Sequence, residues 1–261
     1  MGTTLTRLRH AGLRDLVSGL MVSLVLFGCT YARKPAGPIP VKEVPAPRQA
    51  PERPLVIVLP GRGDDLDDLA RTGIAEAVQK GWPDADVLLA GVTIGYYADG
   101  KIAQRLHDEV IVPARQRGYH EIWLSGASMG GVGALLYERS YPHDVTGLVL
   151  YAPFMGDPTL IREVVAAGGP SAWDPGPPPA AVDSDNYQRE LWRLVKGWQD
   201  PQEGRRIWLA CGDRDRFVAV ARLIAPLLLK DHYAEIGGGH DWEVWDQGAL
   251  YVFSRIAALP R

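Results

Sequence analysis

The sequence predicts an α/β fold in which a mostly parallel central sheet is flanked by helices. Short apolar runs rich in β-branched residues alternate with longer stretches of helical periodicity, which is typical of a sheet covered on both faces. The 261 residues are 46% hydrophobic and 23% charged, an ordinary globular balance that allows a sizeable core. A single α/β domain of roughly 200–250 residues accommodates most of such a chain.

The predicted strands share one pattern, a short apolar run. The first run, LVIVLP at 55–60, contains no charged residue and has the composition of a strand buried on both faces. The later runs are predicted to be strands for the same reason, and they lie at 86–92, 121–126, 146–153, 205–211 and 232–236.

Helices are predicted between these strands. Within 102–118, Ile102, Leu106, Val110 and Ala114 recur at helical spacing and mark an amphipathic helix. Pro113 has no N–H to donate, so we expect it to bend this helix. The other predicted helices lie at roughly 66–80, 129–139, 217–230 and 242–258.

Residues 156–201 interrupt the alternation. The segment begins with a proline-rich stretch and ends with YQRELWRLVKGW, which has a helical pattern. We interpret it as a small insertion over the site rather than as a second domain. Its tryptophans Trp173, Trp192 and Trp198 either line an acyl or aromatic pocket or belong to the core, the commoner place for such residues.

Residues 1–28 are predicted to be an export signal. Arginines near the start precede an apolar run at 16–28, which is too short to span a bilayer and fits the apolar region of a signal peptide. The sequence LFGC at 26–29 resembles a bacterial lipobox, and this resemblance implies that Cys29 is the lipidated first residue of the mature protein. An uncleaved anchor or an ordinary secretory signal is the alternative.

Residues 29–53 are predicted to be a tether. Seven prolines lie between residues 31 and 54, which favours an extended, polyproline-like chain. Lipid on Cys29 would hold the domain at 54–261 against a membrane surface. We therefore expect the protein in a bacterial cell envelope, at the outer membrane or periplasmic face. Thr30, and not aspartate, follows Cys29, and the sorting rule for bacterial lipoproteins then favours the outer membrane. Acylation of Cys29 would leave Cys211, the only other cysteine, without an intramolecular disulfide partner.

Charge and motif content exclude several classes of function. The net charge is -3 and no basic block stands out in the body of the chain, so we expect no nucleic-acid partner. The sequence has no P-loop, HExxH, paired CxxC or strand-linked GxGxxG motif, so we expect no cofactor and no metal. The acidic run at 64–68 is interpreted as a helix N-terminus, because its spacing lacks the full ligand set of a calcium loop.

Ser128 is the candidate nucleophile. It is the central residue of Gly126-Ala127-Ser128-Met129-Gly130, a G-x-S-x-G motif between a predicted strand and a predicted helix. Glycines flank the serine because side chains there would clash in so tight a turn. The motif therefore predicts a serine held clear of the strand end.

His240 is the candidate base that a nucleophilic serine requires. The chain has six histidines, and His240 directly follows Gly237-Gly238-Gly239 and the last predicted strand. It is therefore expected at the carboxyl edge of the sheet, where Ser128 also lies. A three-glycine loop suggests that the backbone passes close to a neighbour there.

The acid that orients His240 is expected in CGDRDRFV, after the fifth predicted strand. Asp213 and Asp215 are both candidates. Asp215 is favoured because it lies further past the strand end and is better placed to reach across the site, whereas Asp213 is expected to cap the turn. The order Ser128, Asp215, His240 is the one found in α/β-hydrolases.

Two backbone N–H groups are predicted to bind the oxyanion of a tetrahedral intermediate. One belongs to Met129, at the start of the helix after Ser128. The other belongs to Arg62, after the first predicted strand. Asp241 and Trp242 are expected to shape the rim of the substrate site.

The chain resembles the esterase D and feruloyl-esterase-like group of α/β-hydrolases over residues 54–258. The resemblance rests on GASMGGVGALLYERSYP at 126–142 and GGGHDWEVW at 237–245. It implies an α/β-hydrolase fold and a serine hydrolase that cleaves small carboxylic esters without a cofactor. An acyltransferase or thioesterase with the same triad, and a non-catalytic envelope protein with the same fold, remain alternatives.

Overall fold

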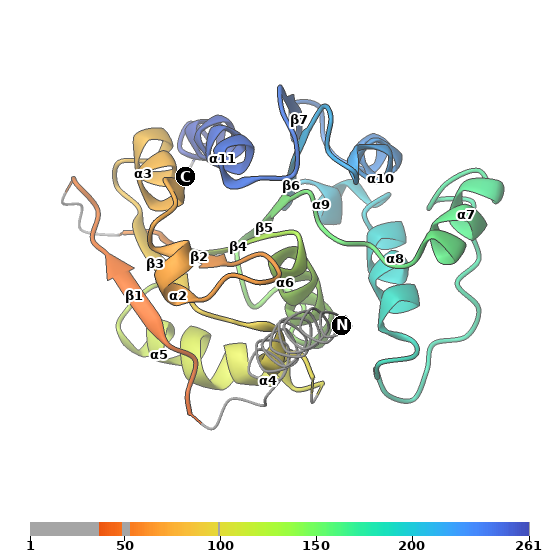
Figure 1. The fold of residues 1–261 in the computed structure, drawn as a ribbon, viewed down its shortest axis with the longest axis horizontal. Helices are drawn as coiled ribbons and strands as arrows, with labels where there is room; N and C mark the ends of the chain where they lie inside the picture. The colour runs from red at the N-terminus through yellow and green to blue at the C-terminus, as the bar shows by residue number, and fades with distance from the viewer. Residues whose placement is uncertain (1–36, 49–52, 99, 261) are drawn as a thin grey trace, which may run out of the picture.

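The computed structural model describes residues 37–48, 53–98 and 100–260. Its centre is a seven-stranded sheet in the order β1-β3-β2-β4-β5-β6-β7 (Figure 1). All neighbouring strands are parallel except β1 and β3, which are antiparallel. The strands are β1 (Val41–Val44), β2 (Leu55–Leu59), β3 (Asp86–Ala90), β4 (Ile122–Ala127), β5 (Gly147–Tyr151), β6 (Ile207–Gly212) and β7 (Tyr233–Ile236). The predicted α/β class and its six parallel strands are confirmed.

Helices cover both faces of the sheet. Figure 1 shows α3 (Ile74–Gly81) and α11 (Trp242–Ile256) packed together on one face. The opposite face carries α4 (Ile102–Leu106), α5 (Val112–Gln116) and α6 (Met129–Ser140). Every residue of β2 to β6 is buried, which explains the continuous apolar runs in the sequence.

The prediction of a tether is wrong for residues 37–48. Val41–Val44 forms the edge strand β1, with Val41 opposite Ala90 in β3. Ala46 is 6% exposed, and its N–H donates to a buried Asp86 carboxylate oxygen at 2.7 Å. A strand forms here because β3 presents an open edge. Residues 1–36, including Cys29, lie outside the described residues.

Several helices are shorter than predicted. The stretch at 66–80 divides into α2 (Leu66–Leu69) and α3. Asp65 caps α2, and its capping box with Asp68 supports the interpretation of the acidic run as a helix N-terminus. The helix predicted at 102–118 contains a π-helical turn at His107–Ile111, which ends two residues before Pro113. Pro113 has no N–H to donate to the Glu109 carbonyl, so one regular helical hydrogen bond is missing here. The wider π-helical turn is consistent with that missing bond.

The helices after β6 also differ slightly from the prediction. The helix predicted at 217–230 is α10 (Val218–Ile224), followed by a 3₁₀ turn at Ala225–Leu227 that contains Pro226. The short α9 (Pro201–Gly204) precedes β6.

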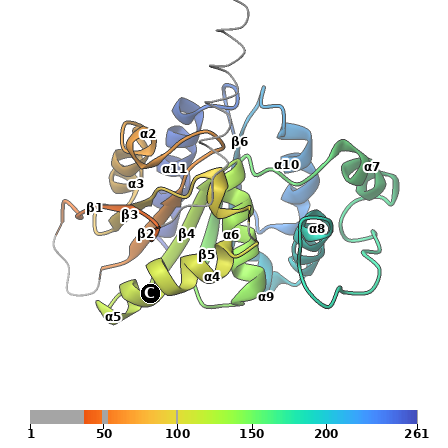
Figure 2. The ribbon, with the colours of Figure 1, turned by 60° about the horizontal axis from the view of Figure 1, so that its bottom comes forward.

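The insertion lies beside the sheet. It contains α7 (Pro158–Ala166), which the sequence did not predict, and α8 (Tyr187–Gly197), which packs on α6 (Figure 2). Its tryptophans Trp173, Trp192 and Trp198 are at most 2% exposed and belong to the core, and Trp198 also lines a cavity between α6 and α8. In residues 37–48, 53–98 and 100–260, no helix has the length and apolar character needed to cross a bilayer.

Candidate active site

Ser128 lies at a sharp turn between β4 and α6. Its φ of 52° and ψ of -106° are unfavourable for a residue with a side chain. A Cβ on Gly126 would lie 2.3 Å from the carbonyl carbon of Gly130, and a Cβ on Gly130 would lie 2.4 Å from the carbonyl oxygen of Leu59. The flanking glycines are therefore required by backbone contact, as the motif predicted.

Backbone hydrogen bonds from β5 and the segment after it hold the turn. The Ser128 N–H donates to Tyr151 O at 2.8 Å, and the Phe154 N–H donates to Ser128 O at 3.1 Å. Met129 is the first residue of α6, so its N–H belongs to the N-terminal turn of that helix. The sheet thus fixes the strained serine in one position.

The glycine loop before His240 passes close to the end of β6. A Cβ on Gly212 would lie 2.4 Å from Gly239 O, and a Cβ on Gly238 would lie 2.3 Å from a methyl carbon of Val244. Gly238 also has a φ of 145°, which other residues rarely adopt. The close approach predicted from the three glycines is present, and it brings His240 toward the end of β6.

Asp215 is the carboxylate that contacts His240. The His240 Nδ1–H donates to Asp215 Oδ2 at 2.8 Å, and the Asp215 side chain is fully buried. Its other oxygen accepts the Phe217 N–H at 2.7 Å. Asp213 instead accepts the Gly238 N–H at 2.8 Å and holds the glycine loop. The geometry therefore distinguishes the two candidates and places Asp215 beside the imidazole.

Two aromatic rings flank His240. Phe217 and Trp245 both present edge-to-face contacts to the imidazole, with centroid distances of 5.1 and 4.9 Å. They restrict rotation of the ring and shield its hydrogen bond to Asp215 from water. Neither residue was predicted from the sequence, because an aromatic residue beside a motif is usually part of the core.

Ser128 and His240 open into one cavity of about 390 Å³. Its walls include Arg62, Asp241 and Trp242, all of which were predicted near the site. Gly61, Asp64, Arg216 and Trp245 complete the lining. None of these residues comes from 156–201. The prediction that the insertion lies over the site is therefore wrong for this cavity. The insertion lies beside the sheet instead, because its helix α8 packs against α6.

The polar groups of the predicted rim residues bind their neighbours. Asp241 caps α11 by accepting the Val244 N–H at 3.2 Å. The indole N–H of Trp242 donates to Asp64 Oδ2 at 3.0 Å and links α11 to the loop after β2. Burial raises the pKa of Asp64, while the indole N–H acts to lower it. Asp64 was not predicted at the site, because the acidic run at 64–68 was interpreted only as a helix N-terminus.

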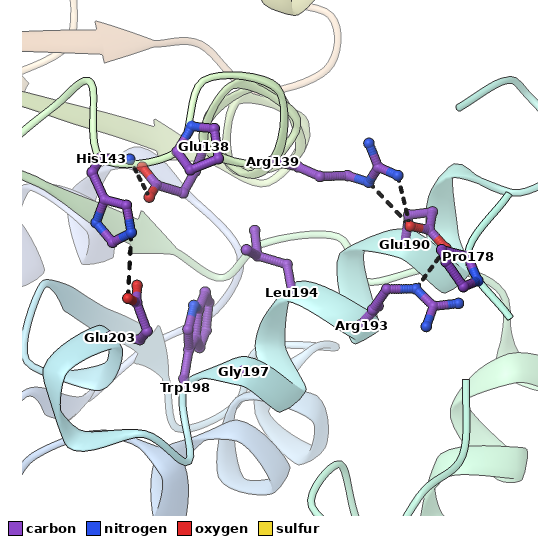
Figure 3. Close-up of a pocket in the computed structure, with 11 residues that line it drawn as sticks. Glu138, Arg139, His143, Pro178, Glu190, Arg193, Leu194, Gly197, Trp198 and Glu203 are labelled. Atoms are coloured by element: carbon purple, nitrogen blue, oxygen red, sulfur yellow. Dashed lines mark hydrogen bonds and ion pairs between the residues drawn. The ribbon is translucent and has the colours of Figure 1, made fainter. Parts of the chain in front are cut away.

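A second cavity, of about 480 Å³, lies between α6 and α8 (Figure 3). Glu190 is 1% exposed there, and it accepts hydrogen bonds from Arg139 at 2.8 Å and Arg193 at 2.9 Å. Both arginines are therefore paired with one buried carboxylate within the protein. The cavity is separate from Ser128 and His240, neither of which lines it.

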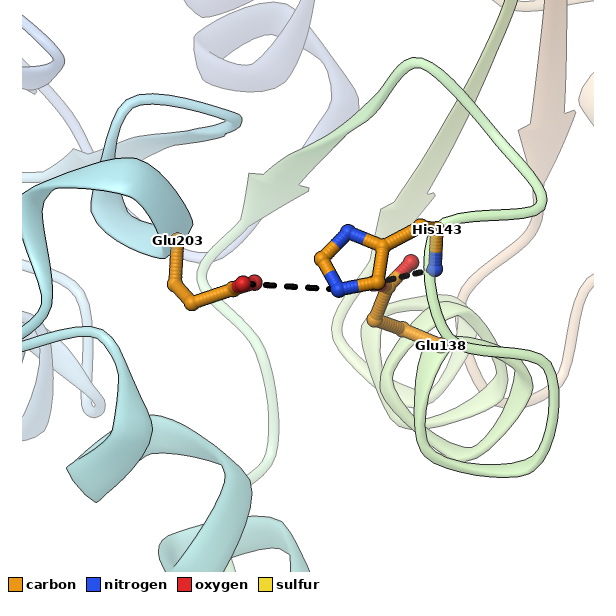
Figure 4. A group of neighbouring side chains, drawn as sticks. All are labelled: Glu138, His143 and Glu203. Carbon is orange, nitrogen blue, oxygen red and sulfur yellow. Dashed lines mark hydrogen bonds and ion pairs between the residues drawn. The ribbon is translucent and has the colours of Figure 1, made fainter.

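Three side chains beside this second cavity have metal-ligand chemistry. Glu138, His143 and Glu203 place ligand atoms within 4.8 Å of one another (Figure 4). Arg206 Nη1, however, lies 2.8 Å from Glu138 Oε1, 2.9 Å from His143 Nδ1 and 3.6 Å from Glu203 Oε2. Because the guanidinium already supplies the positive charge, we interpret the cluster as an ion-pair network.

Comparisons with known proteins identify the family and the fold of this chain. Residues 102–250 match the family described as "Putative esterase". Est1E from Butyrivibrio proteoclasticus is similar in structure, with a TM-score of 0.56 and 17% identity over 83% of this chain and 91% of its own. S-formylglutathione hydrolase (FrmB) from Staphylococcus aureus has a TM-score of 0.54 and 12% identity over 85% and 98% of the two chains.

A monoacylglycerol lipase from Paleococcus ferrophilus has a TM-score of 0.52 and 14% identity over 84% of this chain and 99% of its own. These structures confirm the predicted α/β-hydrolase fold. A search of curated protein sequences found no match.

Proposed function

The chain belongs to this esterase family and is a carboxylic ester hydrolase, and from this premise we propose that it works through an acyl-enzyme on Ser128. Ser128 Oγ attacks the ester carbonyl carbon while His240 Nε2 accepts the hydroxyl proton. The tetrahedral intermediate collapses as His240 gives that proton to the leaving alcohol. Water then attacks the acyl group with His240 again as base, which releases the acid and restores Ser128.

The observation that carries this mechanism is the 2.8 Å contact between His240 and Asp215 in the cavity that Ser128 lines. With Nδ1–H donating to Asp215, Nε2 is the basic nitrogen. A fully buried carboxylate at that distance stabilises the imidazolium formed during each step. The N–H groups of Met129 and Arg62 are the proposed oxyanion donors, each contributing about 3 kcal/mol to the transition state.

A small-molecule ester is the proposed substrate. The cavity of about 390 Å³ is within the range of small-ligand sites, roughly 300–1,000 Å³. Est1E has been described with ferulic acid bound, which supports a substrate of this kind for the fold.

The test uses a fluorophosphonate, which reacts with activated serines. We expect one adduct on Ser128 of the full-length chain, located by intact mass and peptide mapping. Ser128→Ala should abolish both the adduct and ester hydrolysis, and His240→Ala should abolish the adduct by removing the base. Ser254→Ala, an exposed serine at the far end of α11, is the matched control and should react as the parent does. An unreactive Ser128 in folded protein would overturn the mechanism.

We also propose that lipid on Cys29 anchors the enzyme to a membrane surface of the bacterial envelope. The lipobox-like LFGC at 26–29 supports this location. Cys29→Ala should move the protein from the membrane fraction to the soluble fraction after cell disruption, and should remove acyl chains detected by mass spectrometry. An unchanged distribution together with an unmodified Cys29 in the parent would contradict the anchor.

A further inference from the structure

Two arginines line the cavity that contains Ser128 and His240. Arg62 follows β2 and Arg216 follows β6, and both residues are exposed. In the sheet, β2 lies on one side of β4, and β6 lies on the other side beyond β5. The two arginines therefore lie on loops on opposite sides of β4, the strand that leads to Ser128.

Neither arginine has a charge partner within the described part of the chain. No ion pair or carboxylate hydrogen bond involves Arg62 or Arg216 there, whereas the nearby Arg214 pairs with Asp213 at 3.7 Å. The guanidinium of Arg216 lies 5.0 Å from the centre of the Phe217 ring. Unpaired cations at a cavity mouth attract anions and raise the local concentration of an anionic substrate.

The carboxylates in the same cavity are already bound by donors. Asp64 accepts the Trp242 indole N–H, and Asp241 accepts a backbone N–H of α11. Burial also raises the pKa of Asp64, so its anionic form is disfavoured relative to an ordinary aspartate. Neutral N–H donors thus hold both carboxylates in place, and neither carboxylate forms an ion pair with Arg62 or Arg216 among the described residues.

Arg216 is held by the same loop that positions the proposed acid. Asp215 N–H donates to Gly212 O at 3.1 Å, and Phe217 N–H donates to Asp215 Oδ1 at 2.7 Å, which fixes the backbone on both sides of Arg216. Phe217 in turn contacts His240 edge to face. A rigid backbone places the guanidinium near the base with little loss of chain entropy on binding.

We propose that Arg62 and Arg216 select esters that carry a carboxylate or phosphate group within a few bonds of the scissile carbonyl. The inference rests on the proposed function, since it assigns the substrate class of the same site. The anion binds between the two guanidinium groups, and the ester carbonyl then lies over Ser128. Arg62 would contribute through its side chain here, in addition to the backbone N–H proposed for the oxyanion.

The experiment compares two acyl chains of equal length. The probes are 4-nitrophenyl hydrogen adipate, which is anionic, and 4-nitrophenyl hexanoate, which is neutral, each corrected for spontaneous hydrolysis. At low ionic strength we expect the full-length protein to favour the adipate roughly threefold to fivefold in kcat/KM, the size of effect that an exposed charge pair produces. The preference should fall with added salt, because salt screens exposed charges.

Variants assign the preference to the site. Arg216→Gln should remove most of the adipate preference, and Arg216→Lys should retain much of it because the charge remains. Arg214→Gln, two residues away and outside the cavity, is the matched control and should keep the parental ratio.

A second pair of esters places the charge in the alcohol part of the substrate. These are the butyryl esters of 4-hydroxybenzoate, which is anionic, and of 4-hydroxybenzamide, which is neutral. The proposal is overturned if neither pair shows a preference, or if the preference survives Arg216→Gln.

Binding to Ser128→Ala separates this proposal from the mechanism. Calorimetry should show tighter binding of the adipate than of the hexanoate, and Arg216→Gln in the same background should remove the difference. If the parent hydrolyses both esters equally and Ser128→Ala binds them equally, the inference is wrong and the proposed function still stands. If the adipate binds selectively but hydrolysis does not depend on Ser128, the inference about the arginines stands and the proposed mechanism is wrong.

Discussion

Ser128 occupies a backbone conformation that most side chains avoid, and the surrounding residues explain why it persists. Gly126 and Gly130 allow backbone contacts too short for any Cβ, and Tyr151 O and the Phe154 N–H fix both sides of the turn. Such strain costs on the order of 1–3 kcal/mol, which the packed sheet offsets. At the scale of single residues, backbone sterics and two hydrogen bonds thus decide where the nucleophile lies.

The choice between Asp213 and Asp215 gives a prediction at this scale. Asp215→Asn should lower kcat by roughly 10³–10⁴-fold, because an amide disfavours the imidazolium and the required tautomer of His240. Asp213→Asn should have a much smaller effect, since its amide oxygen can still accept the Gly238 N–H. Steady-state kinetics on a 4-nitrophenyl ester measures both variants. A loss of similar size in Asp213→Asn would show that the loop, and not the contact at His240, limits the reaction.

At the scale of elements, helix α11 joins the site to the rest of the fold. Asp241 caps its N-terminus, Trp242 is its first residue, and Trp245 contacts His240. One residue further, Asp246 Oδ2 accepts the Gly73 N–H at 3.1 Å and connects α11 to the start of α3. Its other oxygen is buried with no hydrogen-bond partner among the described residues. The contact between α3 and α11 therefore includes a carboxylate in an unfavourable environment.

Asp246 should make stability depend on pH. Burial raises its pKa from the ordinary 3.8 to about 6, with the Gly73 N–H acting against the increase and Glu76 adding to it. The folded protein therefore binds the proton more tightly than the unfolded chain does. This contribution to stability is present below about pH 4 and is lost as pH rises toward about 6.

The variant Asp246→Asn tests that dependence. At pH 7 it should raise the free energy of unfolding by about 1 kcal/mol, a value reduced for partial exposure, because it removes a poorly solvated charge. At pH 4 the gain should vanish. Urea unfolding at the two pH values measures both, and an equal gain at both would point to packing instead of charge.

At the scale of the whole molecule, the segment at 37–48 closes one edge of the sheet. Asp86, 5% exposed at the start of β3, accepts the Ala46 N–H, a guanidinium N–H of Arg53 and the Tyr119 hydroxyl. These donors come from three parts of the chain. One buried carboxylate therefore connects the N-terminal segment to the hydrolase sheet.

We expect Asp86→Ala to lower the free energy of unfolding by about 2–4 kcal/mol, because buried donors lose their acceptor. Hydrogen exchange should increase in residues 37–48, while kcat/KM should change little, since Asp86 lies at the amino end of β3, away from Ser128. Asp108→Ala, an exposed aspartate before α5, is the matched control and should change neither quantity. Unaltered exchange at 37–48 would show that β1 is held without Asp86.

The sequence by itself determined the parallel strands, the glycine-flanked Ser128 and the position of His240 at the sheet edge. These features depend on local periodicity and backbone sterics, which neighbouring residues express directly. The tertiary structure decided the contact of Asp215 with His240, the pairing of β1 with β3 and the burial of the insertion's tryptophans. Each of these depends on a partner distant in the chain, and no local pattern encodes which distant group will be within hydrogen-bonding or packing distance.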